Sequence, residues 1–210
     1  SHDGTRVGLV TASAMISMVA AAPAKPTISR GRRPGRSIRN IGRMVVAQVG
    51  ALAAMARLAG TRVSYVKPHG ALGNLAAADM TVAKAIVSVV KSIDPSLAVL
   101  AISGTELERT AREQEVQVFS EIFADRAYLP NGQLVPRSQA GAMLHDAKEA
   151  ADRLIGYLQT GRMPVLGAEP IPLKADSICV HGDSAEAVEM ARLVRMRLEA
   201  EGVTVASFVA

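Results

Sequence analysis

The chain has 210 residues, a length that suits one domain with a full hydrophobic core. Apolar residues make up 49% of it, but aromatic residues only 3%, so we expect a core of small and branched aliphatic side chains. A single cysteine, Cys179, excludes an intrachain disulfide and is typical of a reducing compartment. We therefore expect one cytoplasmic domain.

The net charge of +5 is concentrated in residues 1–43, where eight Lys or Arg residues stand against Asp3 alone and leave the rest at −2. The Arg, Gly and Pro of residues 29–36 have no aromatic neighbours, which is more typical of a solvated loop than of a nucleic-acid site. No apolar run reaches the roughly 18–20 residues of a membrane span. The apolar stretch 9–24 lacks the basic leading region of a signal peptide. We expect neither a nucleic-acid nor a membrane partner.

From about Arg43 the pattern alternates helices with strands. One helix, with Val45 and Val49 on its apolar face, is expected to end at Gly60, and a strand is expected over 61–66. The pattern further predicts helices capped by Asp79, Thr105, Asp146 and Asp183, strands over 97–102, 116–123, 177–180 and 203–208, and a hairpin over 163–174. This alternation predicts an α/β fold with a parallel sheet or a (β/α) barrel.

The stretch from residue 63 to residue 74 is predicted to be a strand that leads into a functional loop. Pro68 ends the strand because it cannot donate to the sheet, and Gly70 allows a sharp turn. Lys67 and His69 are then presented at the carboxyl end of the strand. In parallel α/β folds this edge binds ligands.

Two later strand ends carry ionisable groups of the same kind. Glu121, Asp125 and Arg126 lie around the end of the 116–123 strand, and His181 and Asp183 follow the 177–180 strand. Such a mixture can position a proton donor and a base, or hold phosphate or a metal. A helix cap at Asp183 and a local ion pair between Asp125 and Arg126 are the structural alternatives. No His-x-x-x-His or Cys-x-x-Cys spacing occurs, so we predict no tightly bound metal.

These residues stand in four motifs. They are Val-Lys-Pro-His-Gly-Ala-Leu at 66–72 with Asn74, Glu-x-Phe-Ala-Asp-Arg at 121–126 with Tyr128, Gly-x-Leu-Val-Pro-Arg at 132–137, and Ser-Ile-Cys-Val-His-Gly-Asp at 177–183. In order and spacing, over about residues 45–208, the chain resembles the LamB/YcsF family, to which the A subunit of bacterial 5-oxoprolinase belongs. The resemblance implies a seven-stranded (β/α) barrel of the glycoside hydrolase/deacetylase type.

The resemblance also implies an activity and its partners. This activity is the ATP-dependent hydrolytic opening of 5-oxoproline to L-glutamate, with the partner subunits B and C and with ATP and Mg²⁺ bound at the level of the complex. A homo-oligomer is a further option. The implied catalytic residues are Lys67, His69, Glu121, His181 and Asp183, and the implied substrate-binding residues are Asn74, Asp125, Arg126 and Arg137. Lys67 would stabilise phosphate or oxyanion charge, and His69 or His181 would transfer protons.

The amino-terminal part departs from the family. The family's opening Asp-Leu-Asn-x-Asp-x-Gly-Glu strand and two His-containing segments are absent, and Gly73 replaces a tyrosine. We expect residues 1–43 to be an atypical, basic, loop-rich segment, and residues 44–210 to form a barrel that is incomplete because the first strands are missing. Its open sheet edges would need cover. A non-catalytic remnant of the family and a metal-dependent, deacetylase-like hydrolase of carbohydrate metabolism are the alternatives.

Overall fold

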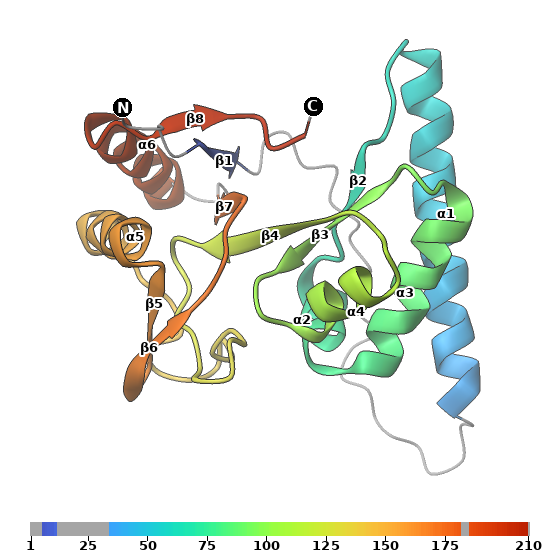
Figure 1. Cartoon of the computed structure of the whole chain (residues 1–210), viewed down its shortest axis with the longest axis horizontal. Helices are drawn as coiled ribbons and strands as arrows, with labels where there is room; N and C mark the ends of the chain where they lie inside the picture. Colours follow the sequence, from blue (N-terminus) through green and yellow to red (C-terminus); the bar gives the residue numbers. More distant parts are fainter. Residues whose placement is uncertain (1–5, 12–33, 182–184, 210) are drawn as a thin grey trace. The chain divides into compact units, whose positions relative to one another are not determined.

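The computed structural model describes residues 6–11, 34–181 and 185–209. Its helices are α1 (Pro34–Leu58), α2 (Gly70–Ala78), α3 (Met80–Ile93), α4 (Glu106–Glu113), α5 (Ala147–Thr160) and α6 (Ala185–Ala200) (Figure 1). Its strands are β1 (Arg6–Thr11), β2 (Tyr65–Val66), β3 (Ala98–Ile102), β4 (Val118–Phe123), β5 (Arg162–Val165), β6 (Ala168–Pro172), β7 (Ser177–Val180) and β8 (Thr204–Ala206). The predicted alternation of helices and strands from residue 43 onward is confirmed.

The chain divides into two compact units, where we expected one domain. Unit 1 consists of Ser1–Ile16, Ile102–Gly104 and Phe119–Ala210. Unit 2 consists of Ser17–Ala101 and Thr105–Val118. Each unit has its own cluster of buried apolar side chains.

Unit 1 contains four parallel strands in the order β4, β7, β1, β8. Helices α5 and α6 pack against each other, and α6 contacts β7 and β8 (Figure 1). The core between the strands and these helices includes Ile122, Leu154, Ile178 and Val194. An antiparallel hairpin of β5 and β6 completes the unit, as predicted for residues 163–174.

The sequence analysis missed strand β1. It lies between β7 and β8 and pairs in parallel with both. A segment of six residues with no helical pattern beside it gives only a weak sequence signal for a strand. Its pairing with β7 on one side and β8 on the other stabilises the extended conformation. The expectation of a loop-rich segment is therefore wrong for residues 6–11. It is also wrong for residues 34–43, which form the first turns of α1, so the boundary expected at 43/44 falls inside a helix.

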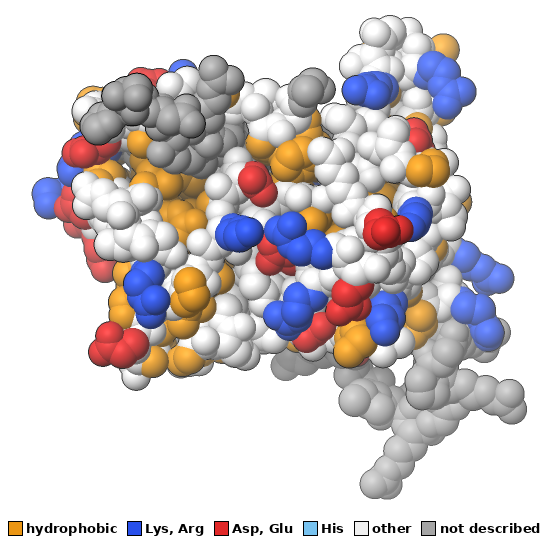
Figure 2. All heavy atoms as spheres, in the orientation of Figure 1, with side chains coloured by type: hydrophobic (Ala, Val, Ile, Leu, Met, Phe, Trp, Pro, Cys, Tyr) orange, Lys and Arg blue, Asp and Glu red, His pale blue; other side chains and the backbone are white. Residues whose placement is uncertain are grey.

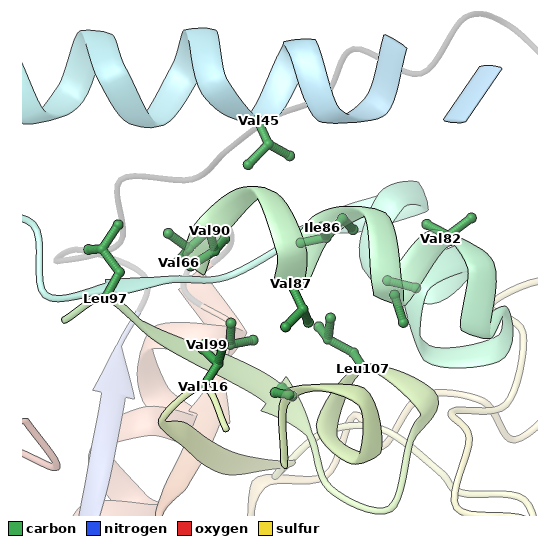
Figure 3. Packing of buried hydrophobic residues seen from close by; sticks show 14 of the residues in the cluster. Val45, Val66, Val82, Ile86, Val87, Val90, Leu97, Val99, Leu107 and Val116 are labelled. Atoms are coloured by element: carbon green, nitrogen blue, oxygen red, sulfur yellow. The ribbon is translucent and has the colours of Figure 1, made fainter. Parts of the chain in front are cut away.

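Unit 2 packs four helices with the parallel pair β2 and β3. Helix α3 is central because it contacts α1, α2 and α4. Figure 3 shows Val45 of α1 pointing toward α3, from which Ile86 and Val90 project into the same cluster. Ile86 and Val90 are fully buried, as the apolar stripe predicts. Strand β2 is shorter than the predicted 61–66.

The predicted caps are confirmed at two helices. Asp79 accepts hydrogen bonds from the backbone N–H groups of Thr81 and Val82, and Asp146 caps α5 in the same way. Thr105 precedes α4 as predicted, but its side chain makes no capping bond. The part of the expected capping box that the Thr105 hydroxyl would supply is therefore wrong. The Glu108 carboxylate accepts a hydrogen bond from the Arg112 guanidinium one turn later.

Helix α1 exposes much of its apolar surface. Its Ile38–Leu58 part is long and apolar enough to cross a membrane, contrary to the expectation from the sequence, and 17% of its most apolar window is buried. The helix has Arg39 and Arg43 in its first half and Arg57 in its last turn, and Figure 2 shows Lys and Arg side chains along its right edge. A single such helix is weak evidence for a membrane span because a helix of a soluble core passes the same test.

Tyr157 of α5 ties the hairpin to its helix by donating its O–H to the Leu173 carbonyl at 3.1 Å. Burial, followed by the charge of Asp176, raises the pKa of Tyr157 to about 12. The unfolded side chain titrates near pH 10, so the free energy of unfolding should fall as the pH rises from about 10 to about 12. Tyr157→Phe should weaken this pH dependence, which urea unfolding at about pH 10 and about pH 12 measures. A variant with the same pH dependence as the wild type would contradict the role of Tyr157.

Candidate active site

Strands β4 and β7 of unit 1 place polar groups on the face opposite the helices. Ile122 of β4 and Ile178 of β7 belong to the core under the helices. Because side chains alternate along a strand, Glu121 and Ser177 point to the other face. The two residues are Cα partners and both are fully buried. A carboxylate and a hydroxyl thus lie deep on this face.

The register continues past the strand ends. The Ala124 N–H donates to the Cys179 carbonyl at 3.0 Å, one step beyond the pairing of Phe123 with Cys179. Asp125 and His181 then leave two neighbouring strands side by side. The structure joins them by a hydrogen bond between Asp125 Oδ2 and His181 Nδ1. The sequence predicted that both strand ends would meet, and for these two residues they do.

The partners of His181 define its tautomer. Nδ1 faces a carboxylate, which only accepts, so this nitrogen carries the proton. Nε2 lies 3.3 Å from a guanidinium nitrogen of Arg137, which only donates. This arrangement leaves Nε2 as the ring nitrogen that can accept a proton, which suits His181 to act as a general base. The side chains of His181 and Asp125 are 18% and 7% exposed, so most water is excluded from the pair.

The second carboxylate oxygen of Asp125 is available to accept a hydrogen bond. Its Oδ1 atom is buried and makes no hydrogen bond to any residue within the described ranges. A buried carboxylate oxygen without a donor costs free energy unless water or a ligand supplies one. This oxygen is suited to receive an N–H or O–H group of a bound molecule.

The two arginines of the site have different partners. Arg126 is 5% exposed and donates to the Val135 carbonyl at 2.7 Å, which closes the 126–135 loop. Burial, followed by the charge of Arg137, lowers the pKa of Arg126. Arg137 is exposed and contacts His181. Of the two, Arg137 has the freer guanidinium for a substrate carboxylate.

Two residues of unit 1 were not among the sequence candidates. Tyr128, which lies in a motif, is fully buried, and its hydroxyl accepts the Phe123 N–H at 2.8 Å. Burial raises its pKa, so it stays a phenol. Arg153 of α5 donates to three backbone carbonyls between residues 123 and 126. An arginine in an amphipathic helix pattern carries no sign of such contacts.

The candidates Lys67, His69 and Asn74 belong to unit 2. Lys67 follows β2 and His69 immediately precedes α2, and both are half-buried. Residues 70–78 form helix α2, so the expected functional loop ends at His69. Asn74 is an exposed residue of that helix. The loop prediction overextended because the Ala-rich stretch after Gly70 favours a helix over a turn.

Glycine is required twice at this helix. Gly70 has φ +57°, a conformation that other residues rarely adopt. A Cβ added at Gly73 would lie 2.7 Å from the Pro68 carbonyl oxygen. The backbone of α2 thus approaches the Lys67–Pro68 segment too closely for any side chain. The tyrosine expected from the family does not fit this backbone.

Asp183, the remaining candidate, lies outside the described residues. Within residues 6–11, 34–181 and 185–209, no three His, Cys, Asp or Glu side chains gather in a way that could hold a metal ion.

Comparison with known sequences assigns the family. The sequence profile of the LamB/YcsF family matches residues 19–210. The chain belongs to the LamB/YcsF family. The match begins upstream of residue 45, where the resemblance in motifs began, so the LamB/YcsF sequence pattern extends into the basic segment.

Curated relatives support the same assignment. The chain is 50% identical over 165 residues to the 5-oxoprolinase A subunit of Gluconobacter oxydans and 48% identical over 164 residues to that of Paracidovorax citrulli. These matches cover 79% and 78% of this chain and 65% of each relative. The chain thus spans about 65% of the length of these relatives.

A solved structure confirms the predicted fold class. The lactam utilization protein of Thermus thermophilus superposes with a TM-score of 0.74 at 38% identity. The superposition covers 81% of this chain and 68% of that protein. The α/β architecture of an incomplete (β/α) barrel is therefore supported by sequence and structure together.

Proposed function

We propose that this chain is the A subunit of a 5-oxoprolinase, a hydrolase that opens the cyclic amide of 5-oxoproline to L-glutamate with hydrolysis of ATP. The names of its relatives support the substrate class, since they are 5-oxoprolinase subunits and a lactam utilization protein. Each 5-oxoprolinase relative is named as one subunit of its enzyme, which implies a complex with other subunits. We propose subunits B and C as the partners, ATP with Mg²⁺ as the nucleotide bound by the complex, and the cytoplasm as its location.

The observation that carries the proposal is the position of His181, whose two ring nitrogens contact Asp125 and Arg137. A lactam is a poor electrophile, and transfer of a phosphoryl group from ATP to its oxygen makes the ring carbon reactive. Water adds to that carbon while His181 Nε2 takes its proton. The C–N bond then breaks, and the ring nitrogen leaves as the amine with a proton. The acyl phosphate left behind reacts with a second water to give glutamate and phosphate.

The other candidates take supporting roles in this proposal. Asp125 keeps the His181 tautomer and stabilises the imidazolium that forms during proton transfer. The Arg137 guanidinium moves from His181 Nε2 to the substrate carboxylate. This movement frees the Nε2 lone pair to accept a proton. Lys67 offsets phosphate or oxyanion charge. His69 is a further candidate for proton transfer. Glu121 and Asp183 orient the histidines or the attacking water, and Asn74 contacts the substrate.

The test is glutamate release from 5-oxoproline in the presence of ATP and the partner subunits. The chain is compared with a version extended at its amino terminus to the length of its relatives. Release by both versions supports the proposal for the chain as it stands. Release by the longer version alone identifies the remnant alternative, which the 65% coverage of the relatives motivates. Release by neither rejects the function, and one bound zinc per chain would then favour the deacetylase-like hydrolase.

A further inference from the structure

We propose that Arg153 is a positioning residue that holds Asp125 against His181. Its guanidinium donates from one nitrogen to the Arg126 carbonyl at 2.8 Å. The other terminal nitrogen donates to the carbonyls of Phe123 at 2.9 Å and Ala124 at 2.7 Å. These carbonyls flank Asp125 on both sides, so one side chain of α5 fixes the backbone from which the Asp125 carboxylate projects.

The Asp125 backbone is held at the remaining positions as well. The Leu144 N–H donates to the Asp125 carbonyl at 2.9 Å, and the Ala124 N–H donates to the Cys179 carbonyl of β7. Four successive carbonyls, from residue 123 to residue 126, thus each accept a hydrogen bond. Arg153 supplies three of them. Without its guanidinium, three carbonyls of buried residues would each lose a hydrogen bond at once.

Arginine suits this position better than another residue. Its planar group carries five N–H donors in a fixed arrangement, whereas a lysine offers a compact ammonium that cannot span three carbonyls in the same geometry. Burial lowers the pKa of Arg153, and the Tyr128 and Asp125 charges act in the opposite direction. The Tyr128 ring lies 6.0 Å from the guanidinium carbon. Helix packing alone would be served by an apolar side chain, without a half-buried cation.

Arg153 acts on His181 through Asp125 and not on the substrate directly. Arg153 sets the direction of the Asp125 carboxylate, which in turn holds the proton on Nδ1 and leaves Nε2 as the base. Misplacement of a catalytic group by about 1 Å can lower a rate by about 100-fold. The rate effect rests on the proposed function, but the contact between Asp125 and His181 does not.

The experiment uses Arg153→Ala and Arg153→Lys, with Arg197→Ala as the matched control. Arg197 also contacts α5, through Asp152, but has no bond to the 123–126 segment. In the complex with its partner subunits, we expect Arg153→Ala to lower kcat by about 10-fold to 100-fold with little change in KM. Arg153→Lys should recover part of the rate, and added millimolar guanidinium should rescue Arg153→Ala alone. Arg197→Ala should match the wild type.

A second readout needs no turnover. In ¹⁵N-edited NMR, the His181 Nδ1 proton of the wild type should give the downfield signal of a histidine bonded to a carboxylate, and this signal should weaken or vanish in Arg153→Ala. A folded Arg153→Ala with an unchanged signal and rate overturns the proposal. If that variant does not fold, the decision falls to Arg153→Lys, in which a wild-type signal and rate would overturn it. A changed signal without any oxoprolinase activity in the wild type would reject only the proposed function.

Discussion

His181→Asn should lower kcat for glutamate release by about 100-fold to 10,000-fold, the range that a general base contributes. The asparagine amide can still donate to Asp125 from near the position of Nδ1, so the buried carboxylate keeps a partner. What the variant loses is the Nε2 lone pair next to Arg137. KM for 5-oxoproline should change much less than kcat. Steady-state kinetics with the complete complex measure both.

Two companion variants separate the base from its surroundings. Asp125→Asn keeps the shape of the carboxyl group but removes the charge that holds the tautomer, so it should also lower kcat strongly. His145→Asn changes an exposed histidine of the same unit and should leave the rate unchanged. A His181→Asn enzyme that retains more than a tenth of the wild-type kcat would rule His181 out as the base.

Much of the fold follows from local signals in the sequence. Asp79 and Asp146 predicted the starts of α3 and α5 because a carboxylate there satisfies the first N–H groups of a helix. The apolar run 178–180 predicted β7 because a strand that is covered on both faces is mostly apolar along its length. Strand β1 had no comparable signal. Its pairing partners lie about 170 residues or more further along the chain, and no local pattern reports such contacts.

In the site as well, the sequence predicted which residues lie close together but not which atoms bond. The rule that parallel strands end at one edge correctly predicted that Asp125 and His181 lie close together. It did not show which oxygen bonds which nitrogen, nor that Arg126 would turn to the Val135 carbonyl while Arg137 reached His181. Those choices depend on loop geometry that the pattern of residue types does not encode.

Arg153 and Gly73 show why some residues escape sequence analysis. In the sequence, a half-buried arginine of an amphipathic helix cannot be told from a solvated one, because its carbonyl partners are set by the fold. Gly73 looked like the loss of a family tyrosine, yet its Cα lies too near the Pro68 carbonyl for a side chain. Comparison with the family identified residue 73 as unusual, and the backbone structure explains why it is a glycine.

Lys67→Ala should lower kcat for glutamate release by about 100-fold to 1,000-fold, the loss expected when one donor to developing negative charge is removed. Lys67 is half-buried between β2 and the start of α2, where the amino-terminal end of the helix adds positive potential. An anion near both would gain from the lysine most when its charge peaks, in the transition state. Lys67→Arg keeps the charge but not the compact ammonium, so we expect it to recover only part of the rate.

The control for Lys67 is Lys84→Ala, which removes an exposed lysine from α3 of the same unit. It should leave kcat, KM and the far-UV circular dichroism spectrum at wild-type values. Lys67→Ala should keep the spectrum as well, because α2 and α3 hold their places through buried residues such as Leu72 and Ile86. If Lys67→Ala folds and releases glutamate at the rate of Lys84→Ala, the lysine has no part in the chemistry. The catalytic groups would then have to be sought among the residues of unit 1.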